Sequence, residues 1–239
     1  MAEAMYPPDE TIWPQVEPHT WKYAPRWHTP RLILIHATRG NNTMELQYQA
    51  TKNWQISPNN RVVEADGSAW ASMSDRIISH EGQLCRTLPE DRHPTWSAGH
   101  MDPWAISYEL AQPPESWGLP FTEACLDRAA REVAQDCVRY GIPAVVLPYV
   151  SGDNHEAPGI ARHDRSANGT TWGKSDPGRF FDDRGFERRV RAYIMPQPTP
   201  EQVLAIVRAL TPALLAGDVG TVHAQIHYLY ALAGKPQPT

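Results

Sequence analysis

Hydrophobic residues along the chain fall into strand-like runs separated by helix-like patterns. Residues 32–35, Leu-Ile-Leu-Ile, form an unbroken apolar run of strand length. Such a run is typical of a strand that is covered on both faces, and it predicts a central position in a sheet. Residues 105–111 also have the length of a strand, and their alternate side chains divide between two faces, with Glu109 opposite to Tyr108. We expect further short strands at 84–88 and 145–150.

Two segments have the spacing of amphipathic helices. Thr43–Ile56 begins with a good N-cap residue and ends before Pro58. Thr122–Tyr140 has the strongest helical pattern in the chain, with Thr122 as its cap and Gly141 as its terminator. The expected apolar faces are Leu46, Ala50 and Trp54 in the first helix, and Leu126, Ala130, Val133, Cys137 and Val138 in the second.

Strands interspersed with helices predict an α/β fold with a central mixed β-sheet flanked by helices. We expect this domain to span residues 31–195, after an irregular proline-rich arm at 1–30. Residues 196–200, Pro-Gln-Pro-Thr-Pro, are typical of a stiff linker. The amphipathic patterns within 201–239 predict a small C-terminal helical hairpin. A hairpin this short buries little surface by itself, so we expect it to dock on the domain, with dimerisation or binding to a partner or to the cell wall as alternatives.

Charge and cysteine content exclude several classes of protein. The 239 residues carry a net charge of −5, so no basic field favours nucleic acid or an anionic membrane surface. The chain has 3 cysteines, and this odd number argues against a disulfide framework. No apolar run has the length of a membrane span or of a signal-peptide core. We therefore expect synthesis in the cytoplasm without a signal peptide. The sequence carries no signal for the oligomeric state.

Candidate catalytic chemistry is concentrated in residues 159–178, which are rich in glycine and polar residues and predict a loop. His163, Lys174 and Asp176 lie close together in this segment. A catalytic zinc ion usually has three protein ligands and leaves one position for water. The segment offers two such ligands, and His36, at the end of the central strand, is well placed to supply the third. The alternative is that these groups are solvated or form an ion pair across the loop.

Four segments resemble the zinc amidases related to peptidoglycan recognition proteins and many phage lysins. Ile33–Thr38 resembles the first zinc-ligand strand of that family, and Trp96–Gly99 resembles its short Trp–His–Ala–Gly segment. Ile106–Leu110 is similar to its glutamate-bearing strand. Residues 163–178 are similar to its closing loop, in which a His ligand is followed by a Lys and, two residues later, by an Asp or Cys ligand. The resemblance covers roughly residues 31–185, in the family's order.

The resemblance implies a Zn²⁺ ion held by His36, His163 and Asp176. Such an ion can activate a water molecule and polarise an amide carbonyl. Glu109 is then expected to carry the proton from the water to the leaving amine, and Lys174 to stabilise the oxyanion. We expect Trp172 to contact the substrate, with simple loop packing as the alternative.

Two positions depart from the family pattern. Ser68-Ala69-Trp70 is expected at the second strand, where some members carry a Tyr followed by a His. Ala69 would replace that Tyr, which leaves the proton-carrying role to Glu109, as in the cytosolic muropeptide-recycling type. Ser97 stands where a His is common, but that His is not a ligand in the pattern, so the metal set is unaffected.

The expected function is therefore an N-acetylmuramoyl-L-alanine amidase that acts on bacterial peptidoglycan. It would cut the amide between N-acetylmuramic acid and the L-Ala of the stem peptide. The missing export signal and the C-terminal appendage favour a phage endolysin that is released through a holin-type lesion. A cytosolic recycling amidase acting on soluble muropeptides is the nearest alternative. A non-catalytic peptidoglycan-binding module is less favoured, because all three candidate ligands are present.

Overall fold

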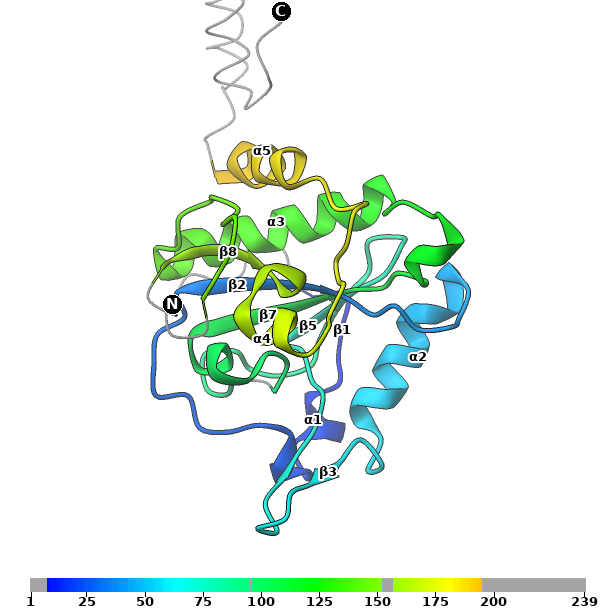
Figure 1. The fold of residues 1–239 in the computed structure, drawn as a ribbon, viewed down its shortest axis with the longest axis vertical. Coiled ribbons are helices and arrows are strands. Elements are labelled where there is room, and N and C mark those ends of the chain that lie inside the picture. The colour runs from blue at the N-terminus through cyan, green and yellow to red at the C-terminus, as the bar shows by residue number, and fades with distance from the viewer. Residues whose placement is uncertain (1–7, 95, 152–156, 195–239) are drawn as a thin grey trace, which may run out of the picture.

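The computed structural model describes residues 8–94, 96–151 and 157–194, and these form an α/β fold around one mixed sheet (Figure 1). The long central strands are β2 (Leu32–Ala37) and β7 (Ala105–Leu110), which pair in parallel. The sheet has the order β1-β6-β5-β7-β2-β8, and only β5 and β6 are antiparallel neighbours. Its remaining strands are β1 (Glu10–Thr11), β5 (Arg76–Ile78), β6 (Leu84–Arg86) and β8 (Gly159–Arg162). The predicted fold class and the two predicted central strands are confirmed.

Helices cover both faces of the sheet. Helices α3 (Glu123–Tyr140) and α5 (Asp183–Ile194) pack together on one face, and α2 (Met44–Ile56) lies on the other (Figure 1). Because side chains alternate along a strand, Ile33 and Ile35 of β2 enter the core beneath α3 and α5. Leu32 and Leu34 enter a separate core on the opposite face. His36 therefore belongs to the face that carries α2, away from α3 and α5.

Helix α3 forms where the sequence predicted it. The Thr122 hydroxyl accepts a hydrogen bond from the amide of Cys125 at the start of the helix, and Gly141 adopts a left-handed conformation with φ of 67° at its end. Leu126, Ala130, Val133 and Cys137 pack into the core as expected. Val138 does not, because its side chain is 66% exposed.

Helix α2 has the predicted bounds, but the prediction of its buried face is wrong. Leu46 and Trp54 are more than half exposed, whereas Tyr48, Lys52 and Gln55 are buried. The Tyr48 hydroxyl and the Lys52 ammonium both donate to the Glu10 carboxylate, and the Gln55 amide donates to the Ser74 hydroxyl. The apolar periodicity of α2 does not predict this face, because the side chains that it buries are mostly polar and form hydrogen bonds.

The N-terminal arm is joined closely to the domain. It contains β1, the short helix α1 (Trp13–Val16) and the 3₁₀ turn η1 (Thr20–Lys22). Strand β1 pairs with β6 at the sheet edge. The fully buried Lys22 ammonium donates to the carbonyls of Gln55 and Ser57, at 2.5 and 2.8 Å, where α2 ends. The arm thereby satisfies carbonyl groups that a helix end leaves unpaired.

Three local predictions need correction. Residues 145–150 do not form a strand and make only isolated bridges, Val146 with Ile160 and Val150 with Ser166. The segment 159–178 is not all loop, because it begins with β8 and continues through the 3₁₀ turn η4 (His163–Arg165) and helix α4 (Ala167–Thr171). These pieces are too short to show a period of their own. Residues 68–70 lie outside the main sheet, since β4 (Ala69–Trp70) pairs only with β3 (Val62–Val63).

The predicted linker at 196–200 and the predicted hairpin within 201–239 lie outside the described residues. Two 3₁₀ turns complete the connections, η2 (Gly99–Trp104) before β7 and η3 (Glu115–Trp117) after it. In the part of the chain that the structure describes, no helix combines the length and the apolar character needed to cross a membrane.

Candidate metal centre

The carboxyl ends of two neighbouring parallel strands bring His36 and His163 together. Strand β2 lies beside β8 with Ile35 opposite Arg162, and each histidine is the next residue along its chain. Asp176 lies in the segment 163–178, called the closing segment from here on. Its backbone carbonyl accepts a hydrogen bond of 2.7 Å from the amide of Asp164. The strand register therefore places two residues that are 127 positions apart at one edge of the sheet.

The three side chains present a compact set of ligand atoms. The Nδ1 atoms of His36 and His163 are 2.9 Å apart. One Asp176 oxygen, Oδ2, lies 3.1 Å from the His163 Nδ1 and 3.3 Å from the His36 Nδ1. All three residues are buried, and together they could hold a metal ion. Ligands about 2.0–2.1 Å from a tetrahedral zinc ion lie about 3.3 Å from one another, so this triangle has nearly the size that zinc requires.

The electrostatics of the cluster favour the forms that bind metal. Burial and the neighbouring His163 together lower the pKa of His36 to about 4, against the opposing effect of Asp176, so the imidazole is neutral at pH 7. Burial alone would raise the pKa of Asp176, but hydrogen bonds and charge interactions with His163 and His36 hold it well below its usual range. Metal ligands must be deprotonated, so a neutral imidazole and a carboxylate suit a divalent cation.

Glu109 lies beside this cluster because β7 and β2 pair with Glu109 opposite His36. Its carboxylate faces a pocket of ≈ 300 Å³ that α2 borders on the other side. Its Oε2 atom is buried and forms no hydrogen bond to the residues that the structure describes. Burial and the Asp176 carboxylate raise the pKa of Glu109 well above its usual range, and Lys174 opposes them. A carboxyl group with a raised pKa can accept a proton near neutral pH and release it again.

Lys174 and Trp172 lie on the closing segment and are both exposed. The charge of the Lys174 ammonium lowers the pKa of His36 and of Glu109, which places it within electrostatic range of the centre. Trp172 is 54% exposed, and its ring packs against Gly99, where an added Cβ would come within 3.1 Å of Cη2. The prediction that Trp172 contacts substrate stays a prediction.

The expected second-strand alignment is wrong, because residues 68–70 lie outside the main sheet. Strand β5, rather than residues 68–70, lies next to β7, and Ile77 is the residue opposite Glu109. Ile77 is buried and apolar, so it cannot handle protons. Of the two residues in this β5–β7 pair, Glu109 is the ionisable one, and its role as proton carrier stays a prediction.

Residues that support the centre were missed from the sequence. The buried Arg162 guanidinium donates to Asp164 at 2.6 and 2.9 Å, to Asp183 at 2.7 Å and to the carbonyl of Gly178 at 2.9 Å. It joins the segments that carry His163 and Asp176 to the start of α5. The neighbouring Arg-His-Asp-Arg run, residues 162–165, was the available signal, because a charged residue at the end of a buried strand needs partners.

One family model matches more than half of the chain. The family model described as N-acetylmuramoyl-L-alanine amidase matches residues 26–179. No curated protein matches the chain.

Several solved structures are similar to the chain. One is the N-acetylmuramoyl-L-alanine amidase LysC from Clostridium intestinale URNW, at 14% identity and a TM-score of 0.46, covering 72% of this chain and 93% of that one. Another is the Staphylococcus aureus hydrolase AmiA in complex with its ligand, at 15% identity and a TM-score of 0.48, covering 73% and 78%. A selenomethionine derivative of AmpD has 19% identity and a TM-score of 0.45, covering 72% and 90%.

Proposed function

The chain belongs to the N-acetylmuramoyl-L-alanine amidase family, and we propose that it uses zinc to cleave the amide between N-acetylmuramic acid and the L-Ala of the peptidoglycan stem. The convergence of His36, His163 and Asp176 on one point is the observation that carries this proposal. Two neutral nitrogen ligands and one carboxylate leave a divalent zinc ion with net positive charge and an open position.

When bound, zinc would lower the pKa of a water molecule and polarise the scissile carbonyl. Glu109 takes the proton that this water loses and delivers it to the leaving amine of L-Ala. Its unpaired oxygen and its position opposite His36 support this role. Lys174 stabilises the negative charge that develops on the carbonyl oxygen, because its ammonium already influences both His36 and Glu109.

The test combines metal analysis with mass spectrometry of digested peptidoglycan. The unaltered chain should hold about one zinc ion and release stem peptides that begin with L-Ala. Asp176→Ala and His163→Ala should lose both the metal and the cleavage. Asp66→Ala is the matched control, because Asp66 is an exposed carboxylate at the turn between β3 and β4. Undiminished hydrolysis in either site variant, or in the chelated protein, would overturn the metal assignment. Wall binding without peptide release would indicate a binding module instead.

We further propose that the substrate is the intact wall and that the enzyme is a phage endolysin, reaching the wall through a holin-type lesion. Two exposed indole rings support a polymeric substrate. Trp54 lines the pocket that holds Glu109, and Trp172 lies on the closing segment. Such flat rings can stack on successive sugar or peptide groups.

The alternative is a recycling amidase that acts on soluble muropeptides. The two are separated by the turbidity of purified cell walls. An endolysin should clear the suspension, whereas a recycling enzyme should leave it turbid and cleave only soluble fragments. Trp54→Ala should slow the clearing of walls more than the cleavage of a short soluble muropeptide. Equal effects on both substrates would argue against a polymer-binding role for this ring.

A further inference from the structure

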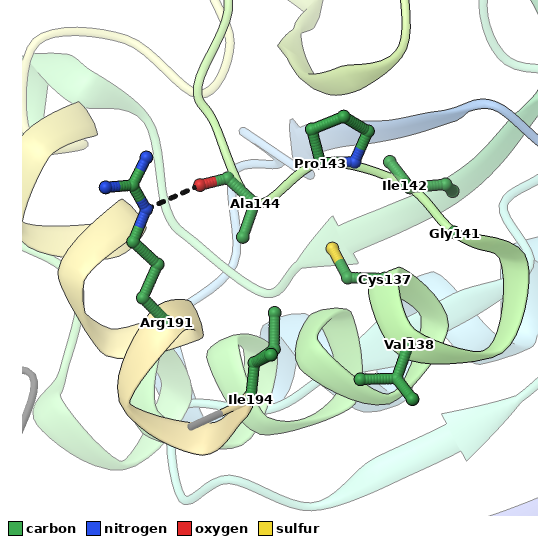
Figure 2. A pocket seen from close by; sticks show the side chains of 8 residues that line it. All are labelled: Cys137, Val138, Gly141, Ile142, Pro143, Ala144, Arg191 and Ile194. Carbon is green, nitrogen blue, oxygen red and sulfur yellow. Dashed lines mark hydrogen bonds between the residues drawn. The ribbon is translucent and has the colours of Figure 1, made fainter. Parts of the chain in front are cut away.

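An apolar hollow of ≈ 500 Å³ lies between the ends of α3 and α5 (Figure 2). Cys137 and Val138 of α3, the loop at 142–144, and Arg191 and Ile194 of α5 line it. Figure 2 shows the side chains of Cys137 and Ile194 directed into the space between the two helices. Helix α5 ends above the sheet on the side where β2 begins, so the hollow lies away from the candidate metal centre (Figure 1).

The walls of the hollow are suited to aliphatic side chains. Its one charged lining residue, Arg191, has its guanidinium occupied, because Nε donates to the Ala144 carbonyl at 3.0 Å and Nη2 pairs with Glu187 at 2.8 Å. Val138 continues the apolar stripe of α3 but is 66% exposed at this hollow. An amphipathic helix normally buries its apolar stripe against another element. The apolar stripe of α3 therefore continues onto the wall of the hollow, where a second amphipathic helix could cover it.

The chain itself supplies an occupant at this place. The described chain ends at Ile194, which lines the hollow. The next six residues, 195–200, contain three prolines and reach at most about 19 Å if they are extended at ~3.1 Å per residue. Residues 201–216 follow immediately. Their sequence repeats apolar residues at helical spacing, namely Val203, Ile206, Val207, Leu210 and Leu214.

We propose that residues 201–216 dock their apolar face in this hollow and cover Val138. The predicted face is aliphatic throughout and matches the aliphatic walls. The short tether keeps the segment within reach of the hollow, so its effective concentration exceeds that of a second copy of the chain in dilute solution. Residues 219–233 fit less well, because their pattern includes tyrosines and histidines. Docking of 201–216 would make α3, α5 and this segment a single helical layer.

The test uses a thiol placed at the hollow in the full chain. Val138→Cys introduces an exposed reporter, while Cys85, Cys125 and Cys137 are buried and provide a slow background. Alkylation of the reporter with a maleimide should be slow if the segment covers it. Adding Leu210→Glu, which puts a charge on the docking face, should raise the rate at least roughly tenfold, the factor for a docking equilibrium constant of about 10. Adding Ala205→Glu, the same charge on the opposite side of the predicted helix, should leave the rate unchanged.

A second experiment changes the hollow instead of the segment 201–216, in case Leu210→Glu disturbs folding. Val138→Glu should increase hydrogen exchange of residues 201–216. Val63→Glu, at an exposed position of β3 outside the hollow, should not. Three results would overturn the proposal: a reporter that reacts equally fast with and without Leu210→Glu, exchange that does not respond to Val138→Glu, or protection that grows with protein concentration. The last result would show that a second copy covers the hollow.

Discussion

Glu109 shows how one register position between two strands determines the chemistry of a site. It lies opposite His36 on β2, so it faces the same side of the sheet as the candidate ligand. A shift of one residue along β7 would present Tyr108 or Leu110 instead, and both of these are needed in the opposite core. The hydrophobic pattern of β7 thereby holds the carboxylate in place.

Replacing Glu109 with Gln should separate metal binding from proton transfer. The amide has nearly the same shape but cannot accept a proton, so zinc content should stay unchanged while turnover falls by about 10²–10⁴-fold. Metal analysis and release of L-Ala stem peptides measure the two effects. Full activity of Glu109→Gln would move the proton-carrying role to another residue.

Gly169 packs closely against the backbone of the candidate ligand His163. A Cβ at position 169 would lie only 1.8 Å from the carbonyl oxygen of His163. Gly169→Ala should push the backbone of His163 away and weaken zinc binding by roughly 10–100-fold, as loss of supporting contacts around a metal does. Competition with a chelator measures the affinity. Thr171→Ala, an exposed change in the same helix, is the control. Unchanged affinity in Gly169→Ala would mean that the loop adapts without moving the ligand.

At the scale of elements, the closing segment is joined by hydrogen bonds to other parts of the domain. Besides Arg162, the Asn168 amide donates to the carbonyl of Ala98 at 2.6 Å and so attaches α4 to η2. The Ser166 hydroxyl accepts from the amide of Gly169 and caps α4. The segment that supplies two of the three candidate ligands is thus attached to the domain through Arg162 and through Asn168.

Arg162→Ala should damage both stability and the centre. It would leave the Asp164 and Asp183 carboxylates without their buried partner, and breaking a buried ion pair costs about 3–5 kcal/mol of unfolding free energy. Zinc affinity should fall as well, because Gly178 loses its tether. Arg165→Ala is the matched control, since Arg165 also pairs with Asp183 but is more exposed, and it should cost less than about 1 kcal/mol. Urea unfolding and metal titration measure both; equal costs for the two variants would contradict this account.

Elements with a long internal pattern could be predicted from the sequence, and elements that depend on their neighbours could not. The apolar run of β2, the alternation in β7, and the stripe and caps of α3 contain their own signal. Strand β8 has four residues and exists because β2 offers it a partner. The triad of His36, His163 and Asp176 was reached from ligand chemistry and motif order. Arg162 and Gly169 were missed because their importance lies in contacts with residues distant in sequence or with a backbone oxygen.

At the scale of the whole molecule, buried ionisable groups join the layers. Arg76 of β5 is fully enclosed and pairs with Glu90 at 3.1 Å and with Asp136 of α3 at 2.9 Å. The Tyr108 hydroxyl of β7 donates to the same Asp136. On the other face, the buried Asp102 of η2 accepts hydrogen bonds from the amides of Ser97 and Ala98, which lie just before η2 in the chain.

Asp102 should make stability depend on pH. Burial raises the pKa of Asp102 to about 7, and the negative charge of Asp75 acts in the same direction. The backbone hydrogen bonds from Ser97 and Ala98 oppose this rise. The folded state therefore keeps a proton that the unfolded state loses near pH 4. This contribution to stability is complete below about pH 4 and is lost as the pH rises through about 7, at up to about 1.4 kcal/mol per pH unit.

Asp102→Asn removes this titration and keeps the accepting oxygen. Between pH 5 and pH 7, its unfolding free energy in urea should therefore fall less than that of the unaltered chain. Asp66→Asn, at an exposed position, should follow the unaltered chain. An identical slope in Asp102→Asn would show that this carboxyl is ionised in the folded protein throughout that range.

The wide separation of the three candidate ligands along the chain has a consequence for biosynthesis. His36 emerges early from the ribosome, but its partners His163 and Asp176 follow only after most of the 239 residues have been made. Strand β8 must also pair with β2 before His163 reaches its place. A chain that ends before residue 163 holds one of the three candidate ligands, and a chain that ends before residue 176 holds at most two. The complete candidate metal centre can therefore form only after residue 176 has been made.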